Sequence, residues 1–212
     1  MFPHAILSTA YFPPIQYFSK VVSYNKITIE QYENYAKQSY RNRCRILSPS
    51  GIQSLSIPVE KISGKKQLMK DLKIDYTLNW QSNHFKSIQT AYFSSPFYEY
   101  YIDAFLPFFK KKTIFLFDFN LEILIMLLHE MQKKRTIICS ESFQPEYQIP
   151  DYRYAIHPKT DHSSDKEFTS IPYTQVFSDK FDFTPNLSIM DLLLNEGPAT
   201  INILEDSFIK FA

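Results

Sequence analysis

HAILSTAYFPPIQYFSKVVSYNKITIEQ, residues 4–31, is the stretch that decides the fold. It opens with a short apolar run that two prolines end, which is typical of a buried strand that delivers the chain to a surface turn. Pro14 can open a helix through Val22, because proline is tolerated in the first helical turn. The last six residues alternate isoleucine with polar neighbours, as a half-buried strand does. The stretch therefore predicts a strand–helix–strand unit.

Residues 41–61 predict a β-hairpin. A Ser-Pro-Ser-Gly turn at residues 48–51 separates Ile46 from an alternating apolar run that begins at Leu55. Residues 61–73 are polar and basic, so we expect a solvated loop there, followed by a short strand at residues 73–76.

Apolar side chains then change to helical spacing. The pattern predicts one helix over residues 79–92 and a second after Pro96, which Pro107 should kink or end. A third helix over residues 115–132 is apolar on most sides and should be central, and residues 136–140 favour a strand.

The second half has no sustained period between residues 141 and 180, which predicts a long ordered loop. Ser188 with Asp191 resembles a capping pair, and Gly197-Pro198 supplies the stop of a short helix. We therefore predict an α/β fold with a mixed sheet, flanking helices and this irregular loop. The chain should form a single domain over 1–212, or two packed lobes, strand-rich to about residue 76 and helix-rich from residue 77.

Composition excludes several classes of protein. The 212 residues carry 23 Lys and Arg against 22 Asp and Glu, so the formal charge of +1 gives no long-range attraction to nucleic acid. Three glycines cannot supply a dinucleotide-binding, P-loop or nucleophile-elbow motif, and no other motif indicates a particular cofactor. Two cysteines are too few for a disulfide framework or a cysteine-ligated zinc site.

The sequence also favours a cytoplasmic protein. The N-terminus lacks the basic region of a signal peptide. The most apolar stretch, residues 115–128, contains Asp118, Asn120 and Glu122 and is shorter than a bilayer span, so we expect no membrane insertion.

Arg41, Arg43 and Arg45 alternate along the first strand of the predicted hairpin, so their guanidinium groups should share one face. Such a cluster suits a phosphate or carboxylate ligand, which arginine binds bidentately. A solvated strand face is an equally good interpretation. Cys44 between them is either a thiol of lowered pKa or, more often for a lone cysteine on a strand, packed and inert.

His84 lies on the apolar stripe of its predicted helix. As a general base it would need access to a pocket and an orienting partner such as Asp75 or Asp191. The alternative is a core histidine paired with a backbone carbonyl, which is the commoner case.

Aromatic and amide side chains at strand ends and in loops could form a sugar- or base-stacking pocket or could pack in the core. They are Tyr11, Tyr17, Tyr173 and Gln175. The histidines and aspartates between residues 157 and 165 arise readily by chance in a polar loop, and we expect no metal site.

Eight strings occur in a distinctive order between Ile6 and Pro198: TAYFPPIQYF, QSYRNRCRI, LSIPV, IDYTLNWQSNHFKSIQTAY, SPFYEYY, LFDFN, PYTQVF and FTPNLSIMDLLLNEGP. In order and spacing they resemble the WbqC-like family, in a compact form. Longer members have Gln-Pro where Thr9-Ala10 stand here, many have Asn in place of Cys44, and they carry a Gly-containing segment in the second half.

The resemblance implies a pathway, because the family is named for a protein encoded among O-antigen biosynthesis genes, and acyl or aminoacyl transfer to an amino sugar has been suggested for its members. The family's distinctive polar residues match Tyr11, Asn42, Arg43, Arg45, Asp75, Trp80, His84, Asp118, Asn120, Gln175, Asn186, Asp191 and Asn195.

Two hypotheses follow. In the first, the protein is a transferase acting on an activated sugar in cell-surface polysaccharide synthesis. Its small-molecule substrate would be a nucleotide sugar or an acyl or aminoacyl donor. His84 and Asp75 would be catalytic, and Tyr11, Asn42, Arg43, Arg45 and Gln175 would bind substrate. In the second, the protein is a non-catalytic binding or assembly protein of the same pathway, with residues 143–177 as its interface.

Asp191 is expected to be chiefly structural. The sequence leaves the oligomeric state open.

Overall fold

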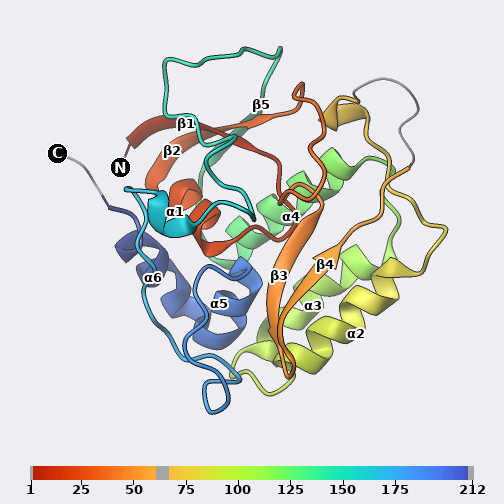
Figure 1. The fold of residues 1–212 in the computed structure, drawn as a ribbon, viewed down its shortest axis with the longest axis vertical. Coiled ribbons are helices and arrows are strands. Elements are labelled where there is room, and N and C mark those ends of the chain that lie inside the picture. Colours follow the sequence, from red (N-terminus) through yellow and green to blue (C-terminus); the bar gives the residue numbers. More distant parts are fainter. Residues whose placement is uncertain (1, 61–66, 210–212) are drawn as a thin grey trace.

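A computed structural model describes residues 2–60 and 67–209 of the chain. A parallel sheet forms its upper part in Figure 1, with the strand order β1 (Phe2–Ser8), β2 (Tyr24–Glu30) and β5 (Thr136–Cys139). Helix α1 (Ile15–Ser23) makes the crossover from β1 to β2. The predicted strand–helix–strand unit is thus confirmed, although the first strand ends at Ser8 rather than Phe12, which has a positive φ of 35° in the turn that follows.

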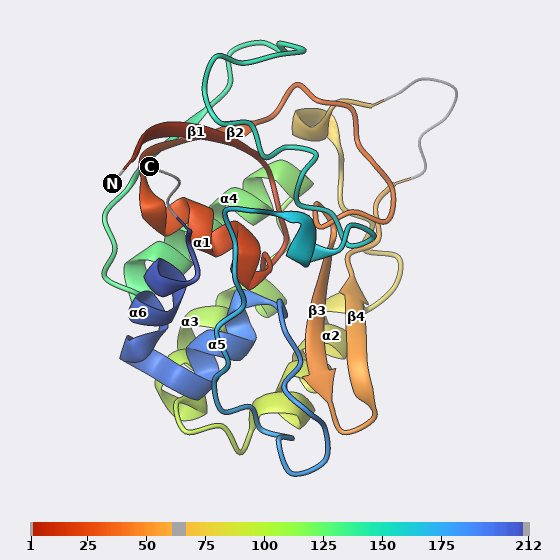
Figure 2. The same ribbon diagram turned by 60° about the vertical axis from the view of Figure 1, so that its left-hand side comes forward.

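The chain returns from β5 to the opposite edge of the sheet. Ile6 of β1 forms a parallel bridge with Asp151, and the Ile6 N–H donates to the Pro150 carbonyl (2.9 Å). Figures 1 and 2 show the loop between β5 and Asp151 on the other side of β1 and β2 from α1. The connection from β1 to β2 therefore covers one face of the sheet, and the connection from β5 to Asp151 covers the other. The two connections diverge at β1.

The predicted hairpin is confirmed as a separate antiparallel pair, β3 (Arg43–Ser48) and β4 (Gly51–Ser56). Helix α2 (Trp80–Tyr92) confirms the helix predicted from the spacing after residue 79, and it packs against β3. The mixed α/β class is therefore correct, with parallel and antiparallel pairing in two different sheets.

The predicted solvated loop at residues 61–73 falls partly outside the described residues. In the part that is described, a 3-10 turn, η1 (Met69–Asp71), places Met69 and Leu72 in the core, so this half of the prediction was wrong. The predicted short strand at residues 73–76 consists of two isolated bridges, from Lys73 to Phe115 and from Ile74 to Val59.

Two further helices complete the middle of the chain. Helix α4 (Leu116–Glu130) is central as predicted, with eight buried residues. Helix α3 (Tyr98–Lys110) continues three residues past Pro107, which was expected to kink or end it. Pro107 lies on the exposed side of the last turn, where the missing N–H leaves a carbonyl that water can satisfy.

The long loop after residue 140 is irregular as predicted, apart from the 3-10 turn η2 (His162–Ser164). Helix α5 (Ile189–Glu196) ends at Gly197, whose φ is 53° and where a Cβ atom would lie 2.5 Å from the Phe97 ring. A further helix follows Gly197, because the turn η3 (Gly197–Ala199) leads into α6 (Thr200–Asp206), which was not predicted.

A cluster of buried apolar residues joins both halves of the chain, including residues of β1, β3, α4, α5 and α6. Within residues 2–60 and 67–209, no helix combines the length and the apolarity needed to cross a bilayer.

Candidate functional site

A small pocket opens at the carboxyl end of β1. It has a volume of about 10 Å³, room for one water molecule, and is lined by Ser8, Thr9, Ala10, Tyr17, Tyr40, Arg41, Tyr152, Arg153 and Ile156. In open α/β sheets, ligands bind outside the carboxyl ends of the strands where connections diverge to opposite faces. Because β1 and the segment after Asp151 meet that description, we call this the switch-point pocket.

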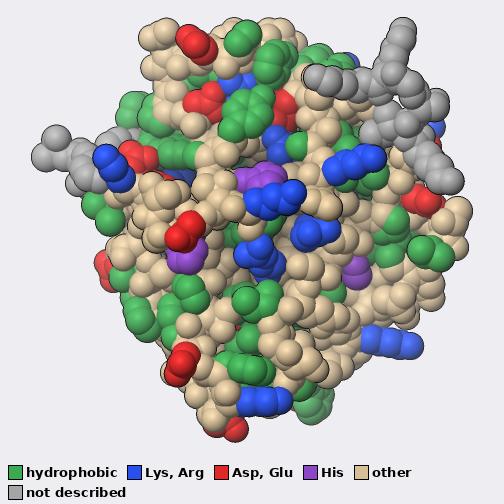
Figure 3. All heavy atoms as spheres, in the orientation of Figure 1, with side chains coloured by type: hydrophobic (Ala, Val, Ile, Leu, Met, Phe, Trp, Pro, Cys, Tyr) green, Lys and Arg blue, Asp and Glu red, His purple; other side chains and the backbone are tan. Residues whose placement is uncertain are grey.

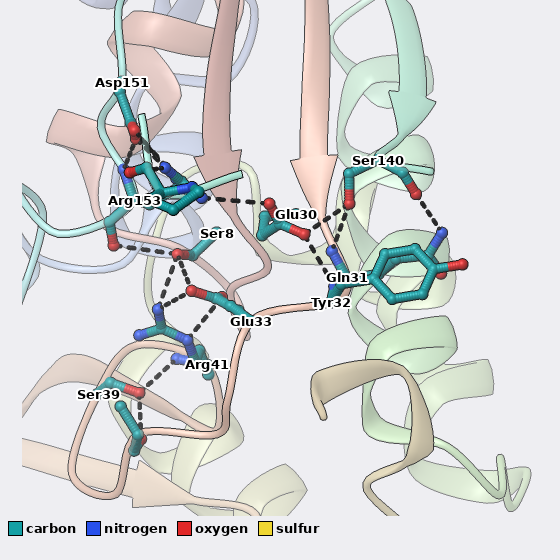
Figure 4. A network of polar contacts seen from close by, with 12 residues as sticks. Ser8, Glu30, Gln31, Tyr32, Glu33, Ser39, Arg41, Ser140, Asp151 and Arg153 are labelled. Carbon is teal, nitrogen blue, oxygen red and sulfur yellow. Dashed lines mark hydrogen bonds and ion pairs between the residues drawn. The ribbon is translucent and has the colours of Figure 1, made fainter. Parts of the chain in front are cut away.

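Buried charges surround the pocket in two groups (Figure 4). In the first, Arg41 Nε donates to Glu33 Oε1 (2.8 Å), and Arg41 Nη2 forms an ion pair with Glu33 Oε2 and donates to Ser8 Oγ (2.9 Å). Ser8 Oγ lies 3.1 Å from Glu33 Oε2 and 3.0 Å from the Arg153 carbonyl oxygen. Within the described chain, Arg41 Nη1 has no hydrogen-bond partner, and it is not one of the buried unpartnered atoms, so this nitrogen keeps accessible surface although Arg41 as a whole is 4% exposed.

The second group is centred on Arg153, which is 1% exposed. Its guanidinium pairs with Glu30 (3.2 Å) and Asp151 (2.6 Å) and also donates to the Gln144 and Pro145 carbonyl groups. The Phe143, Tyr147 and Tyr154 rings lie 4.7–5.5 Å from it. Arg153 thus fixes the loop over the sheet against the end of β2.

Four basic residues lie in the two chain segments that follow the pocket-lining Arg41 and Ile156: Arg43, Arg45, His157 and Lys159. We call these four residues the basic rim. The same two segments line the pocket and the rim, since Arg43 and Arg45 follow Arg41, and Arg45 Nη2 donates to the Pro158 carbonyl (2.6 Å). Figure 3 shows Lys, Arg and His side chains gathered near the upper end of β3.

The predicted face of three arginines is thus divided. Arg41 precedes β3 and is buried against Glu33, whereas Arg43 and Arg45 lie on the strand and are half-buried. Arg43 Nε donates to Ser56 Oγ (3.0 Å), and within the described residues neither Arg43 nor Arg45 has a carboxylate partner. Burial, with the nearby Arg41 and Lys159 charges, lowers the pKa of His157.

His84 is buried, at 6% exposure, between the Trp80 ring and Tyr11. Its Nδ1 lies 2.9 Å from the Tyr11 hydroxyl. Burial lowers the pKa of His84 to about 4, and a hydrogen bond with the Ser56 backbone opposes this shift only in part. This environment matches the core-histidine interpretation more closely than a base exposed to a pocket.

Of the other residues singled out in the sequence, Tyr17 lines the switch-point pocket, and its hydroxyl donates to the Ser8 carbonyl (2.9 Å). Asp75, Asn42, Tyr11 and Gln175 are not among the residues that line the pocket. Asp75, the predicted partner of His84, is half-buried and accepts the Thr77 N–H (2.8 Å) in a local turn. Asn42 Nδ2 donates to the Ile57 carbonyl (2.8 Å) and so holds the base of the hairpin. The Tyr11 N–H donates to the Tyr40 carbonyl, which connects the end of the β1 turn to the pocket wall.

Gln175 and Asp191 form a separate buried cluster. Asp191 Oδ2 accepts the Tyr173 hydroxyl (2.5 Å) and the Gln175 side-chain N–H (3.2 Å). Burial raises the pKa of Asp191, and the hydrogen bonds from Tyr173 and Gln175 oppose that shift. Ser188 caps α5 through the Met190 N–H as predicted, but the Asp191 carboxylate faces Tyr173 and Gln175 instead of pairing with the cap.

Cys44 is fully buried, and burial raises the pKa of its thiol, which agrees with the packed, inert interpretation. Among residues 2–60 and 67–209, no three His, Cys, Asp or Glu side chains come together as a metal site would require.

An α/β protein with a polar pocket at the carboxyl ends of its parallel strands is the class that this geometry defines. The chain belongs to the WbqC-like protein family, whose model matches residues 9–164. It is similar to uncharacterized protein Rv1507c of Mycobacterium tuberculosis, with 26% identity over 108 residues. That match covers 51% of this chain and 46% of the relative. No solved structure matches the chain significantly.

Sequence reasoning missed two residues that line the pocket, Ser8 and Arg153, and the two carboxylates that pair with its buried arginines, Glu30 and Glu33. The sequence contains no signal for Ser8 and Glu30, because the predicted strands ran past them to Phe12 and Gln31, whereas β1 and β2 end at Ser8 and Glu30. No local pattern marks Arg153, which reaches Glu30 across 123 positions of sequence.

Proposed function

We propose that the protein binds a phosphate-bearing activated sugar on the basic rim and transfers an acyl or aminoacyl group to or from it, in cell-surface polysaccharide synthesis. The observation that carries the proposal is the pair of half-buried guanidinium groups of Arg43 and Arg45, which share a strand face without a carboxylate partner in the described chain. An arginine without a carboxylate partner can bind two oxygens of a tetrahedral phosphate through parallel N–H groups.

The pocket supports the transfer half of the proposal. The pocket has room for one water molecule, so a ligand whose phosphate lies on the rim would bring only its reacting group, and not its sugar ring, to the pocket beside Ser8 and Arg41. The WbqC-like resemblance supports the polysaccharide pathway and the amino sugar. Activated sugars are made on nucleotide carriers in the cytoplasm, so we also propose a cytoplasmic location.

Non-catalytic binding in the same pathway is the second candidate. The burial of His84 favours it, because the residue proposed as catalytic base is enclosed by Trp80 and Tyr11. In this candidate the basic rim keeps its role in binding, and no group is transferred.

The binding test uses isothermal titration with inorganic pyrophosphate and with UDP-N-acetylglucosamine as probes. Arg43→Ala or Arg45→Ala should weaken binding by about 1.5–3 kcal/mol, the usual contribution of charge-assisted hydrogen bonds, with the fold intact. Lys110→Ala is the matched control, because it removes one exposed positive charge at the end of α3. Equal affinities in all three folded variants would remove the rim from the site.

A transfer assay separates the two candidates. The protein is incubated with an acyl thioester and an amino-sugar nucleotide, and the acylated product is sought by mass spectrometry. Turnover that requires Arg43 and Arg45 supports the transferase. Binding without product supports the non-catalytic candidate.

A further inference from the structure

Ser8 occupies a position where a nucleophile could act. It is the last residue of β1, it lines the switch-point pocket, and its hydroxyl lies 3.1 Å from Glu33 Oε2. A nucleophile within hydrogen-bond reach of a base, with a third group orienting that base, is the arrangement that activates serine for covalent catalysis. Arg41 supplies the third group by contacting both carboxylate oxygens of Glu33.

The hydroxyl proton of Ser8 has two acceptors within reach, Glu33 Oε2 and the Arg153 carbonyl oxygen at 3.0 Å. Arg41 Nη2 donates to the same Oγ from a third direction (2.9 Å). These contacts hold Oγ in place and leave its remaining lone pair as the nucleophile.

Arg41 also offers a donor for developing negative charge. Its Nη1 has no partner among the described residues, and Arg41 itself is 4% exposed and lines the pocket. A fixed N–H donor in a pocket that admits little water stabilises an oxyanion more strongly than the same donor in solvent.

We propose that Ser8 is the acyl-accepting nucleophile of the pocket, with Glu33 as its general base and Arg41 Nη1 as the oxyanion donor. This inference rests on the proposed transferase function and names its substrate class, an ester or thioester of a carboxylic acid. Ser8 Oγ attacks the carbonyl carbon of the donor while its proton passes to Glu33. The carbonyl electron pair moves onto the oxygen that faces Arg41.

Collapse of this intermediate breaks the bond to the leaving thiolate or alkoxide, which takes the proton from Glu33. An ester on Ser8 remains. In the second step the amine or hydroxyl of the acceptor attacks that ester and gives its proton to Glu33. The bond to Oγ then breaks, and Oγ recovers the proton, so that the site returns to its starting state without an oxidant or reductant.

The test is covalent labelling with a fluorophosphonate ester, followed by peptide mapping. The folded wild-type protein should be labelled on Ser8, and the heat-denatured protein and Ser8→Ala should not. Glu33→Gln keeps the shape of the side chain and removes the base, so the labelling rate should fall by about 10²–10⁴-fold. Ser164→Ala, in the exposed η2 turn, should be labelled like the wild type.

Absence of label on Ser8 in the folded wild type would overturn the inference, whatever the stability of Glu33→Gln. Label on Ser8 at an equal rate in folded Glu33→Gln would overturn the role of Glu33. The pyrophosphate titration keeps the two proposals separate, because Ser8→Ala should bind this probe like the wild type. An unlabelled Ser8 in a protein that still binds pyrophosphate through Arg43 and Arg45 leaves the binding function standing.

Discussion

Acidification should destabilise the protein through one buried side chain, His84. The ring is 6% exposed and contacts the Tyr11 hydroxyl and the Trp80 ring, so the folded state holds it neutral. The unfolded chain exposes the same ring to water, where it takes up a proton at its ordinary pKa of 6.5. Between these two pKa values the unfolded state binds more protons, and the stability falls as the pH falls.

The size of the effect follows from the two pKa values. With 6.5 in the unfolded chain and about 4 in the folded protein, linkage gives a loss of about 2 kcal/mol at pH 5 and about 3 kcal/mol at pH 4, relative to pH 8. The contribution is fully present above pH 6.5 and is lost progressively down to about pH 4. Typical domains have unfolding free energies of about 5–15 kcal/mol, so this loss is readily measured.

Urea denaturation at pH 8, 6.5, 5 and 4 measures the effect in the wild type and in His84→Gln. The variant should be less stable at pH 8, because the contacts with Tyr11 and Trp80 change, but it should lack the loss assigned to His84. His129→Gln is the matched control, because that side chain is 84% exposed and should leave the wild-type pH dependence unchanged. Parallel curves for wild type and His84→Gln between pH 6.5 and pH 4 would refute the reasoning.

Two further outcomes are expected elsewhere in the chain. Asp191→Asn should lower the free energy of unfolding by about 1–3 kcal/mol in urea denaturation, because it weakens the acceptor of the Tyr173 and Gln175 hydrogen bonds. The affinity for pyrophosphate should stay at the wild-type value. Lost affinity at unchanged stability would place Asp191 in the ligand site. Iodoacetamide should modify the half-buried Cys139 before the fully buried Cys44 in the native protein, as peptide mapping would show, and a faster Cys44 would contradict the packed environment of its thiol.

The sequence pattern was sufficient to predict those helices and strands that neighbouring residues determine. The alternation of Ile27 and Ile29 with polar residues predicted β2, but the strand is not half-buried as expected, because Thr28 and Glu30 are buried too. The Ser-Pro-Ser-Gly turn places β3 and β4 correctly. The stripe from Trp80 to Ile88 likewise gave α2, because its spacing matches one face of a helix.

Predictions failed where a distant contact decides the structure. Gly197-Pro198 has the local features of a helix stop, and α5 does end there, but the chain then turns into α6, which packs on α1. Pro107 was expected to kink or end α3, but the helix continues to Lys110, and the exposed position of Pro107 leaves Phe105 and Phe109 buried. Neither outcome can be derived from the neighbouring residues alone.

The candidate site shows the same limit. Arg43 and Arg45 were predicted because their alternation is local, whereas the pairing of Arg41 with Glu33 depends on the turn between β2 and β3. His84 was singled out as a polar residue on an apolar stripe, and only the packing shows that its ring is enclosed. Ser8 and Arg153 lie 145 positions apart and meet only through the parallel arrangement of the sheet.

The distribution of charge in the site constrains the ligand that we propose. Around the switch-point pocket, Arg41 and Arg153 meet three carboxylates, those of Glu30, Glu33 and Asp151, so the interior is neutral to acidic. The basic rim has no carboxylate partner for Arg43 or Arg45 in the described chain. A ligand that is anionic throughout would therefore be repelled from the interior, whereas one with a phosphate at one end and an amine or hydroxyl at the other would match both regions. An acceptor amino sugar on a phosphate carrier has this polarity, and in the proposed binding mode its reacting group would face Ser8 and Glu33.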